Sequence, residues 1–324
     1  MKIIPALATA LTLLAGAARA QESLPLTVQL NWVAQAEFAG YHVAQEMDFY
    51  RDEGLEVTLL PGGPGIPPLQ SLARGRADVA IERMPAALVA RERGLPVVNV
   101  AQPLGGSGQV LVCRTDSGIA SPADLAGKVV GTWFQGHEYP LTGWLARMGL
   151  EGQVTLLAQD QGIAPLLQGQ ADCISAMRYH EYPRILDTGF PAEDLVVLPL
   201  SDMLEDGVYT LEQTLADPQG AEALTRFLRA SMRGWEHAAQ DPEEAARILS
   251  RTAQGRALTP EQHRRMVEAV TPLLEPAGAL DPQAYQRTVD LLTEGGILRQ
   301  RPENSWVSTI TDRMAPPAET APPE

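Results

Sequence analysis

Short apolar runs alternate with amphipathic stretches through the first two thirds of the chain. The runs have the length and the β-branched content of buried strands, and the stretches between them repeat apolar residues at helical spacing. The predicted strands are 26–30, 56–60, 79–81, 97–101, 109–113, 129–132, 154–157, 172–176 and 195–198. The predicted helices between them are 40–53, 67–74, 84–94, 140–148 and 163–168. This alternation predicts α/β lobes with largely parallel sheets.

After about residue 215 the pattern changes to helices only. Four predicted helices begin where a capping side chain precedes a proline, at Asp217, Asp241, Thr259 and Asp281. Proline is favoured at the first helical position because its missing N–H would have no partner there. The last residues, 315–324, are rich in Pro, Ala and Glu and are predicted to be disordered.

Residues 1–20 have the pattern of a secretory signal peptide. Lys2 precedes an apolar run that ends at Ala17, and Ala18-Arg19-Ala20 gives a small-x-small cleavage site. The run is too short to cross about 30 Å of hydrocarbon, and an uncleaved anchor would need roughly 20 apolar residues. We therefore expect a periplasmic protein whose mature chain is not inserted in a membrane.

The charge balance disfavours polyanionic partners. The chain of 324 residues carries 25 Lys and Arg against 40 Asp and Glu, and residues 1–20 contain no acid, so the remainder is strongly acidic. Such a surface repels nucleic-acid phosphates and anionic lipid headgroups. A chain of this length usually forms two cores, so two lobes are expected.

The two cysteines fall in predicted strands. Cys113 ends one strand and Cys173 lies in another, and an exported compartment permits disulfides. A bond requires the two strands to be neighbours. Otherwise both residues are buried thiols that act as small apolar side chains.

Most aromatic residues gather in three clusters, within 32–50, 133–144 and 179–182, each just after a predicted strand. In α/β folds the carboxyl ends of strands form the ligand crevice. Aromatic faces there would sandwich a flat ring, whereas Phe49, Tyr50 and Trp144 fit helical periodicity and are predicted to be core.

The candidate ligand contacts combine these aromatic residues with polar neighbours. We expect Trp32 and Tyr139 to stack on the ligand, with Trp133 and Phe134 as second choices. The further aromatic candidates are Phe38 and Tyr179, and the polar candidates are Asn31, Gln35, Glu82, Glu138 and Glu181. This combination suits a planar heterocycle that forms hydrogen bonds.

Several motifs resemble one known family. They are Leu30-Asn31-Trp32, Phe38-Ala-Gly-Tyr41, Phe49-Tyr50-Arg-Asp-Glu53-Gly54, Gly75-Arg-Ala-Asp78 and Gly169-Gln-Ala-Asp172. With their neighbours they make about residues 26–250 similar to the thiamine-pyrimidine family, which lies close to the nitrate, sulfonate and taurine binding proteins of ABC importers.

The resemblance implies an α/β fold of the type II periplasmic-binding class. Lobe 1 would be discontinuous, from 24–105 plus 200–310, and lobe 2 would be 106–199, with two chain crossings as the hinge. Family receptors of this kind act as monomers and deliver a small ligand to an ABC permease.

The resemblance also includes the fungal pyrimidine synthase, which carries pyridoxal phosphate on a lysine and uses a nearby histidine. The matching positions here hold Glu82 and Ala86, and the chain has no cysteine cluster. A carboxylate forms no Schiff base, so no cofactor and no such enzyme activity are expected.

Other catalytic or metal sites have little support. No two histidines have the i, i+4 spacing of a metal site. The adjacent pairs His137 with Glu138 and His180 with Glu181 could do acid–base work, but adjacent residues more often point in different directions. No metal is expected.

The sequence therefore predicts an extracytoplasmic receptor for a thiamine-precursor pyrimidine or a similar small aromatic heterocycle. Three alternatives stay open. A riboflavin receptor would need a wider pocket, a receptor for a sulfonate or nitrate anion would need cationic or N–H donors, and a periplasmic enzyme would turn its ligand over.

Overall fold

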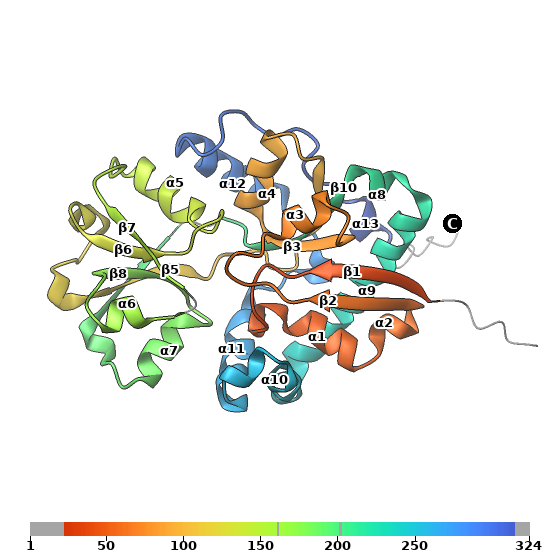
Figure 1. Cartoon of the computed structure of the whole chain (residues 1–324), viewed down its shortest axis with the longest axis horizontal. Helices are drawn as coiled ribbons and strands as arrows, with labels where there is room; N and C mark the ends of the chain where they lie inside the picture. The colour runs from red at the N-terminus through yellow and green to blue at the C-terminus, as the bar shows by residue number, and fades with distance from the viewer. Residues whose placement is uncertain (1–22, 161, 201–202, 315–324) are drawn as a thin grey trace, which may run out of the picture.

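The computed structural model describes residues 23–160, 162–200 and 203–314. The predicted signal peptide (1–20) and the predicted disordered tail (315–324) lie outside these residues. The described chain forms two mixed sheets of five strands, each covered by helices, and the sheets lie side by side in the long direction of the molecule (Figure 1). Among the described residues no helix is both long and apolar enough to cross a bilayer.

The first sheet has the strand order β2-β1-β3-β10-β4. Its strands are β1 (Leu24–Gln29), β2 (Leu55–Leu60), β3 (Val79–Arg83), β4 (Val97–Ala101) and β10 (Asp206–Leu211). β1 pairs in parallel with β2 and β3, whereas β10 is antiparallel to both β3 and β4. We call this sheet and the helices packed on it the first half.

The second sheet has the order β7-β6-β8-β5-β9. Its strands are β5 (Gln109–Arg114), β6 (Val129–Thr132), β7 (Thr155–Ala158), β8 (Cys173–Met177) and β9 (Leu195–Pro199). β6 pairs in parallel with β7 and β8, and β5 is antiparallel to β8 and β9. This sheet and its helices are the second half.

Two expectations about the sheets were wrong. Each sheet is mixed rather than largely parallel, and the sequence analysis missed β10, which lies between β3 and β4. β10 opens with Asp206-Gly207, a pair that is typical of turns. Glycine is required there because a Cβ on Gly207 would lie 2.4 Å from the Asn99 side-chain nitrogen.

Helices cover both sheets and form the carboxyl-terminal region of the first half. The α-helices are α1 (Ala39–Glu46), α2 (Phe49–Asp52), α3 (Pro68–Ala73), α4 (Met84–Glu92), α5 (Tyr139–Arg147), α6 (Ala164–Leu167), α7 (Glu181–Asp187), α8 (Glu212–Ala216), α9 (Pro218–Gln240), α10 (Pro242–Arg251), α11 (Pro260–Val270), α12 (Pro282–Glu294) and α13 (Thr309–Asp312). The short 3₁₀ helices are η1 (Ala36–Phe38), η2 (Thr115–Ser117), η3 (Pro122–Leu125), η4 (Ala192–Asp194), η5 (Gly255–Ala257), η6 (Thr271–Leu273) and η7 (Pro276–Gly278).

The four predicted helix starts are confirmed. Asp217, Asp241, Thr259 and Asp281 each accept a hydrogen bond from a backbone N–H in the first turn of α9, α10, α11 and α12. A proline occupies the first helical position in every case. These caps satisfy N–H groups that have no partner inside the helix.

An aromatic stack forms the centre of the core of the first half. Phe227 on α9 stacks on Tyr41 and Tyr50, with ring centroids 6.1 and 5.5 Å apart. All three rings are buried, which confirms Tyr50 as core, and Phe49 packs against the same cluster. Trp144, also predicted as core, is partly buried against the core of the second half.

The two cysteines form a disulfide. β5 pairs with β8 so that Cys113 lies directly opposite Cys173, and the two sulfurs are bonded. Both residues are fully buried. The bond therefore joins two neighbouring strands inside the second half.

The chain passes between the halves twice, once after β4 and once after β9. Glu205, just before β10, joins the two crossings because its Oε1 accepts hydrogen bonds from the Gly108 N–H at 2.6 Å and from the Ser107 hydroxyl at 3.1 Å. Gln102 donates to the backbone oxygens of Glu205 and Asp206. The lobe boundaries at 105/106 and 199/200 stay predictions.

Removing the disulfide should destabilise the second half. Replacing both cysteines by alanine should lower the free energy of unfolding by about 4 kcal/mol, because the bond joins residues separated by 60 positions in the sequence. Urea titration followed by tryptophan fluorescence measures this change. Dithiothreitol should lower the urea midpoint of the wild type and leave that of the double variant unchanged. Coincident unfolding curves for the two proteins without dithiothreitol would contradict the prediction.

Candidate functional site

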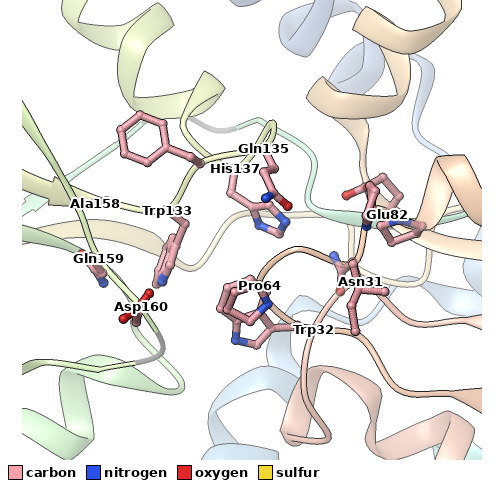
Figure 2. Close-up of a pocket in the computed structure, with 15 residues that line it drawn as sticks. Asn31, Trp32, Pro64, Glu82, Trp133, Gln135, His137, Ala158, Gln159 and Asp160 are labelled. Carbon is pink, nitrogen blue, oxygen red and sulfur yellow. The ribbon is translucent and has the colours of Figure 1, made fainter.

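A cavity of about 160 Å³ lies between the two halves. Figure 2 shows residues of the second half on one side, with Trp133 and Asp160 labelled, and Asn31 and Glu82 of the first half on the other. The lining residues are Asn31, Trp32, Gly63, Pro64, Ile66, Pro67, Pro68, Glu82, Trp133, Phe134, Gln135, His137, Ala158, Gln159 and Asp160. Its volume admits a small ring compound and far exceeds the space that one water needs.

The ends of parallel strands supply most of this lining. Asn31 and Trp32 follow β1, Trp133 follows β6, and Gln159 follows β7, while Glu82 lies near the end of β3. The carboxyl ends of parallel strands meet at one edge of a sheet, where α/β folds bind ligands. The two sheets present these edges to each other across the cavity.

The indoles of Trp32 and Trp133 form an aromatic corner. Their ring centroids are 6.4 Å apart and their planes are inclined by 69°, and the His137 ring lies 5.3 Å from Trp32. The expected sandwich of parallel rings is therefore not the arrangement found. The corner offers a flat ligand the face of one indole and the edge of the other, a geometry that aromatic groups favour.

Three buried polar atoms at this cavity have no hydrogen-bond partner within the described residues. They are the Asn31 Oδ1, the Trp133 Nε1 and the Gln159 Oε1. Buried polar atoms normally have partners. Two acceptors and one donor are thus unpaired beside the cavity.

Glu82 adds a neutral acid to this set. Burial raises the pKa of Glu82 from its ordinary value to about 8, although its Oε1 accepts a hydrogen bond from the Arg83 N–H at 2.9 Å. The side chain is therefore mostly protonated at pH 7. A protonated carboxyl both donates and accepts a hydrogen bond.

His137 is held neutral at the same cavity. Burial, and next the charge of Arg83, lower the pKa of His137 to about 3. Glu138 points elsewhere, since it lines a different cavity and its Oε2 accepts the Gly136 N–H at 2.7 Å. These two neighbours point in different directions, as expected for adjacent residues.

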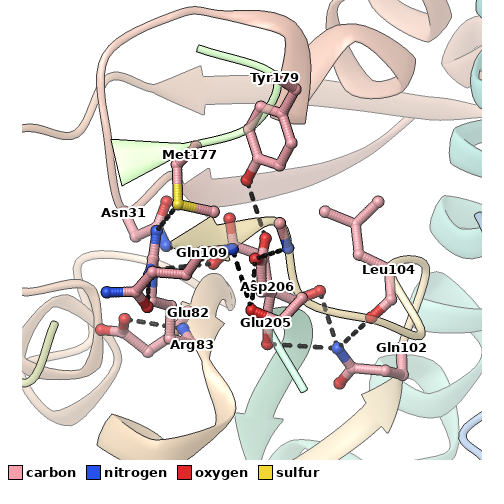
Figure 3. Close-up of polar contacts among 12 residues, drawn as sticks. Asn31, Glu82, Arg83, Gln102, Leu104, Gln109, Met177, Tyr179, Glu205 and Asp206 are labelled. Atoms are coloured by element: carbon pink, nitrogen blue, oxygen red, sulfur yellow. Dashed lines mark hydrogen bonds and ion pairs between the residues drawn. The ribbon is translucent and has the colours of Figure 1, made fainter. Parts of the chain in front are cut away.

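Arg83, the last residue of β3, connects the two halves through polar contacts (Figure 3). Its guanidinium donates to the Gln109 Oε1 at 3.2 Å and to the Met177 Sδ at 3.5 Å, both in the second half. It also lies 5.7 Å from the centroid of the Trp133 ring and 4.0 Å from the Asp206 Oδ1. The Asn31 amide donates to the same Asp206 oxygen at 2.7 Å.

Several buried acids surround this one guanidinium. Burial disfavours the charge of Arg83, but Asp206 and Glu205 outweigh it and raise its pKa. Burial, and next the charge of Asp206, raise the pKa of Glu37 well above its usual range. Because Glu37 and Glu82 are neutral, the Arg83 guanidinium has Asp206 and Glu205 to balance. A buried cluster in this way avoids several uncompensated charges.

The structure brings Asn31, Trp32, Glu82, Trp133 and Phe134 together at one cavity. The side chain of Phe134 is 42% exposed, so it lies at the mouth. Whether these residues bind a ligand stays a prediction.

Tyr139 and Glu138 line a second, neighbouring cavity. The expected pair of stacking residues, Trp32 and Tyr139, is therefore divided between two cavities. Trp133, a second choice in the sequence analysis, takes the place opposite Trp32.

The other four candidates do not line either cavity. Phe38 is fully buried in the core of the first half, and the Tyr179 hydroxyl donates to the Glu205 Oε2 at 2.8 Å. Gln35 is buried beside Glu37, whose pKa it lowers through a hydrogen bond. We withdraw these three as ligand contacts because tight packing or internal hydrogen bonds hold their side chains.

Glu181 is the fourth candidate to be withdrawn. Its Oε2 accepts the Met177 N–H, and its Oε1 lies 2.6 Å from the His180 Nδ1. Burial raises the pKa of Glu181, but His180 outweighs that effect and the pKa is lowered. The expectation that His180 and Glu181 point apart was wrong, because they form a buried pair.

Sequence reasoning missed Arg83, Asp206 and Gln159. The signal for Arg83 was a cation that directly follows the apolar run 79–81 and Glu82. Asp206 lies in the strand that was missed, and Gln159 directly follows β7. Among the described residues no group of His, Cys, Asp and Glu side chains could hold a metal ion.

The sequence profile of the NMT1/THI5-like family matches residues 35–245, and the chain belongs to this family. The formylaminopyrimidine-binding protein of Halalkalibacterium halodurans is 28% identical over 313 residues, which cover 88% of this chain and 90% of that protein. The 4-amino-5-hydroxymethyl-2-methylpyrimidine phosphate synthase of Legionella pneumophila is 23% identical over 241 residues, which cover 69% and 72%. The proteins that this chain is similar to thus include a binding protein and an enzyme.

A solved structure shows the same fold. The alkanesulfonate-binding protein SsuA of Xanthomonas axonopodis pv. citri, bound to MOPS, matches with a TM-score of 0.68 at 17% identity, covering 88% of this chain and 99% of that chain. The expected α/β fold of periplasmic binding proteins is confirmed.

Removing the Arg83 charge should destabilise the protein. Arg83→Met leaves Asp206 and Glu205 without their cation, and the loss of one member of a buried ion cluster costs about 3–5 kcal/mol. Chemical denaturation measures the change. Arg74→Met, at an exposed position, is the matched control and should change stability by less than about 0.5 kcal/mol. Equal stability of the two variants would contradict the prediction.

Glu82 should make stability depend on pH. Its pKa is about 8 in the folded chain against the ordinary value of 4.5. Between these two values the folded state binds more protons than the unfolded state. The contribution of Glu82 to the free energy of unfolding is therefore complete below pH 4.5 and is lost as the pH rises through 8. Glu82→Gln should flatten the decline of the unfolding free energy over this window. Parallel curves for wild type and variant would show that Glu82 has an ordinary pKa.

Proposed function

We propose that this chain is an extracytoplasmic receptor that binds a 4-aminopyrimidine precursor of thiamine and delivers it to an ABC permease. One observation carries the proposal. An aromatic corner, a neutral acid and three unpartnered polar atoms of the described residues surround a cavity of about 160 Å³ between two α/β halves.

The cavity is chemically complementary to an aminopyrimidine. Such a ring carries an amino group, which donates, next to a ring nitrogen, which accepts. A protonated Glu82 presents the reverse order, a carbonyl oxygen beside an O–H. Asn31 Oδ1 and Gln159 Oε1 accept the remaining N–H, and Trp133 Nε1 donates to a ring nitrogen or hydroxyl.

The interactions expected at this cavity are strong enough to bind a transported solute. Each net hydrogen bond contributes about 1 kcal/mol, and the aromatic corner adds about as much beyond the area it buries. The apolar area that the two indoles cover and closure of the halves provide the rest. The formylaminopyrimidine-binding relative supports this ligand class.

Cavity size and charge favour this ligand over the alternatives. A flavin tricycle is wider than a single ring, and the part of the space beside the two indoles, about 160 Å³, suits a single ring. Asp160 lines the cavity, and an acidic side chain there disfavours a sulfonate or nitrate anion. Asp206 already pairs with Arg83, the cation nearest to the corner.

We also propose that the chain binds without turning its ligand over, acts as a monomer and resides in the periplasm. Glu82 stands where the resemblance places the cofactor lysine of the synthases. A carboxyl group cannot form the Schiff base that this chemistry needs. Receptor relatives of the same fold support transport.

Isothermal titration calorimetry tests the ligand class directly. The protein should bind 4-amino-5-hydroxymethyl-2-methylpyrimidine, and should bind riboflavin and taurine at least a hundredfold more weakly. Mass spectrometry after incubation should recover the pyrimidine unchanged. Preferential binding of riboflavin or taurine, or turnover of the pyrimidine, would overturn the proposal.

The aromatic corner gives a sharper prediction. Trp32→Leu and Trp133→Leu should each weaken pyrimidine binding about tenfold, because leucine keeps apolar bulk and removes the ring. Trp144→Leu, on α5 and outside the cavity, is the matched control and should bind like wild type. Wild-type affinity in both corner variants would remove the corner from the site.

A further inference from the structure

A second and larger cavity, of about 670 Å³, adjoins the first. Pro67, Glu82 and Gln135 line both cavities. The Gln135 Oε1 also accepts the Gly65 N–H at 3.2 Å, which connects the two halves at this junction. A ligand ring beside Glu82 would thus face the opening of a space that the ring itself does not fill.

One face of α4 forms a wall of the second cavity. Ala86, Val89, Ala90 and Arg93 line it, and their spacing of three, four and seven residues places them on one side of a helix. Ala86 and Val89 are buried, whereas Arg93, just past the last residue of α4, is exposed. The wall is therefore apolar near Glu82 and cationic at its far end.

The opposite wall comes from the second half. Gly136, Glu138 and Tyr139 line it. Glu138 accepts the Gly136 N–H with Oε2, and within the described residues its Oε1 accepts no hydrogen bond. The lining of the cavity thus contains an acceptor, Glu138, and a cation, Arg93.

The length of the wall follows from helix geometry. Seven residues separate Ala86 from Arg93, and a rise of 1.5 Å per residue gives about 10 Å. A hydroxymethyl group is far too short to cross this distance. An occupant that reaches Arg93 must be an arm of several bonds.

We propose that the second cavity binds a substituent of the ligand whose ring occupies the first cavity. This inference rests on the proposed function and names its substrate class, a 4-aminopyrimidine with an extended arm that ends in an acceptor. The arm packs on Ala86 and Ala90, a donor on it bonds Glu138, and a terminal carbonyl or carboxylate reaches Arg93.

Two pyrimidines with the same ring test this inference by calorimetry. One is 4-amino-5-hydroxymethyl-2-methylpyrimidine, and the other carries a succinylaminomethyl group at position 5. Wild type should bind the long-armed compound at least tenfold more tightly. Equal or weaker binding of the long-armed compound would overturn the inference and leave the proposed function standing, whereas failure of both compounds to bind would overturn both.

Two variants separate the cavities. Arg93→Gln, at an exposed position, should weaken binding of the long-armed compound about fivefold and change the short one less than twofold. Ala90→Phe fills the second cavity and should remove the preference for the long arm. Arg74→Gln, exposed and outside both cavities, is the charge-matched control and should match wild type. Equal effects of Arg93→Gln on the two compounds would contradict the assignment.

Discussion

A buried guanidinium contacts both halves beside the aromatic corner. Arg83 ends a strand of the first sheet and contacts Gln109 and Met177 at the ends of two strands of the second. Its charge is sustained by Asp206 and Glu205, and it lies against the Trp133 ring. Burial, and to a smaller extent the charge of Asp206, raise the pKa values of Glu37 and Glu82, and this leaves a protonated carboxyl of Glu82 at the cavity.

The buried polar network positions the side chains around the cavity. Asn31 binds Asp206 through its amide nitrogen and keeps its oxygen for the cavity, while Glu205 and Tyr179 join the chain crossings. The hydrogen bonds to Asp206 and Glu205 therefore fix the positions of side chains near the cavity, such as Asn31. In the proposed function a flat solute would meet a preformed set of donors and acceptors, which would limit the ordering that binding must impose.

The sequence pattern predicted nine of the strands and the four capped helices because apolar periodicity and capping chemistry are local. It also located the aromatic clusters after strands. It could not tell which side chains there point into the cleft. Phe38 and Tyr179 follow the same pattern as Trp32 but are buried by packing between distant segments. β10 and Asp206 were missed because a central strand that starts with Asp-Gly has no local signal.

The central claim is that an aminopyrimidine ring lies in the corner between Trp32 and Trp133. A crystal structure of the protein with 4-amino-5-hydroxymethyl-2-methylpyrimidine measures this directly. We expect the ring against the two indoles, with its amino group and adjacent nitrogen on the Glu82 carboxyl. A ring bound elsewhere, or a corner that stays empty at saturating ligand concentration, would contradict it.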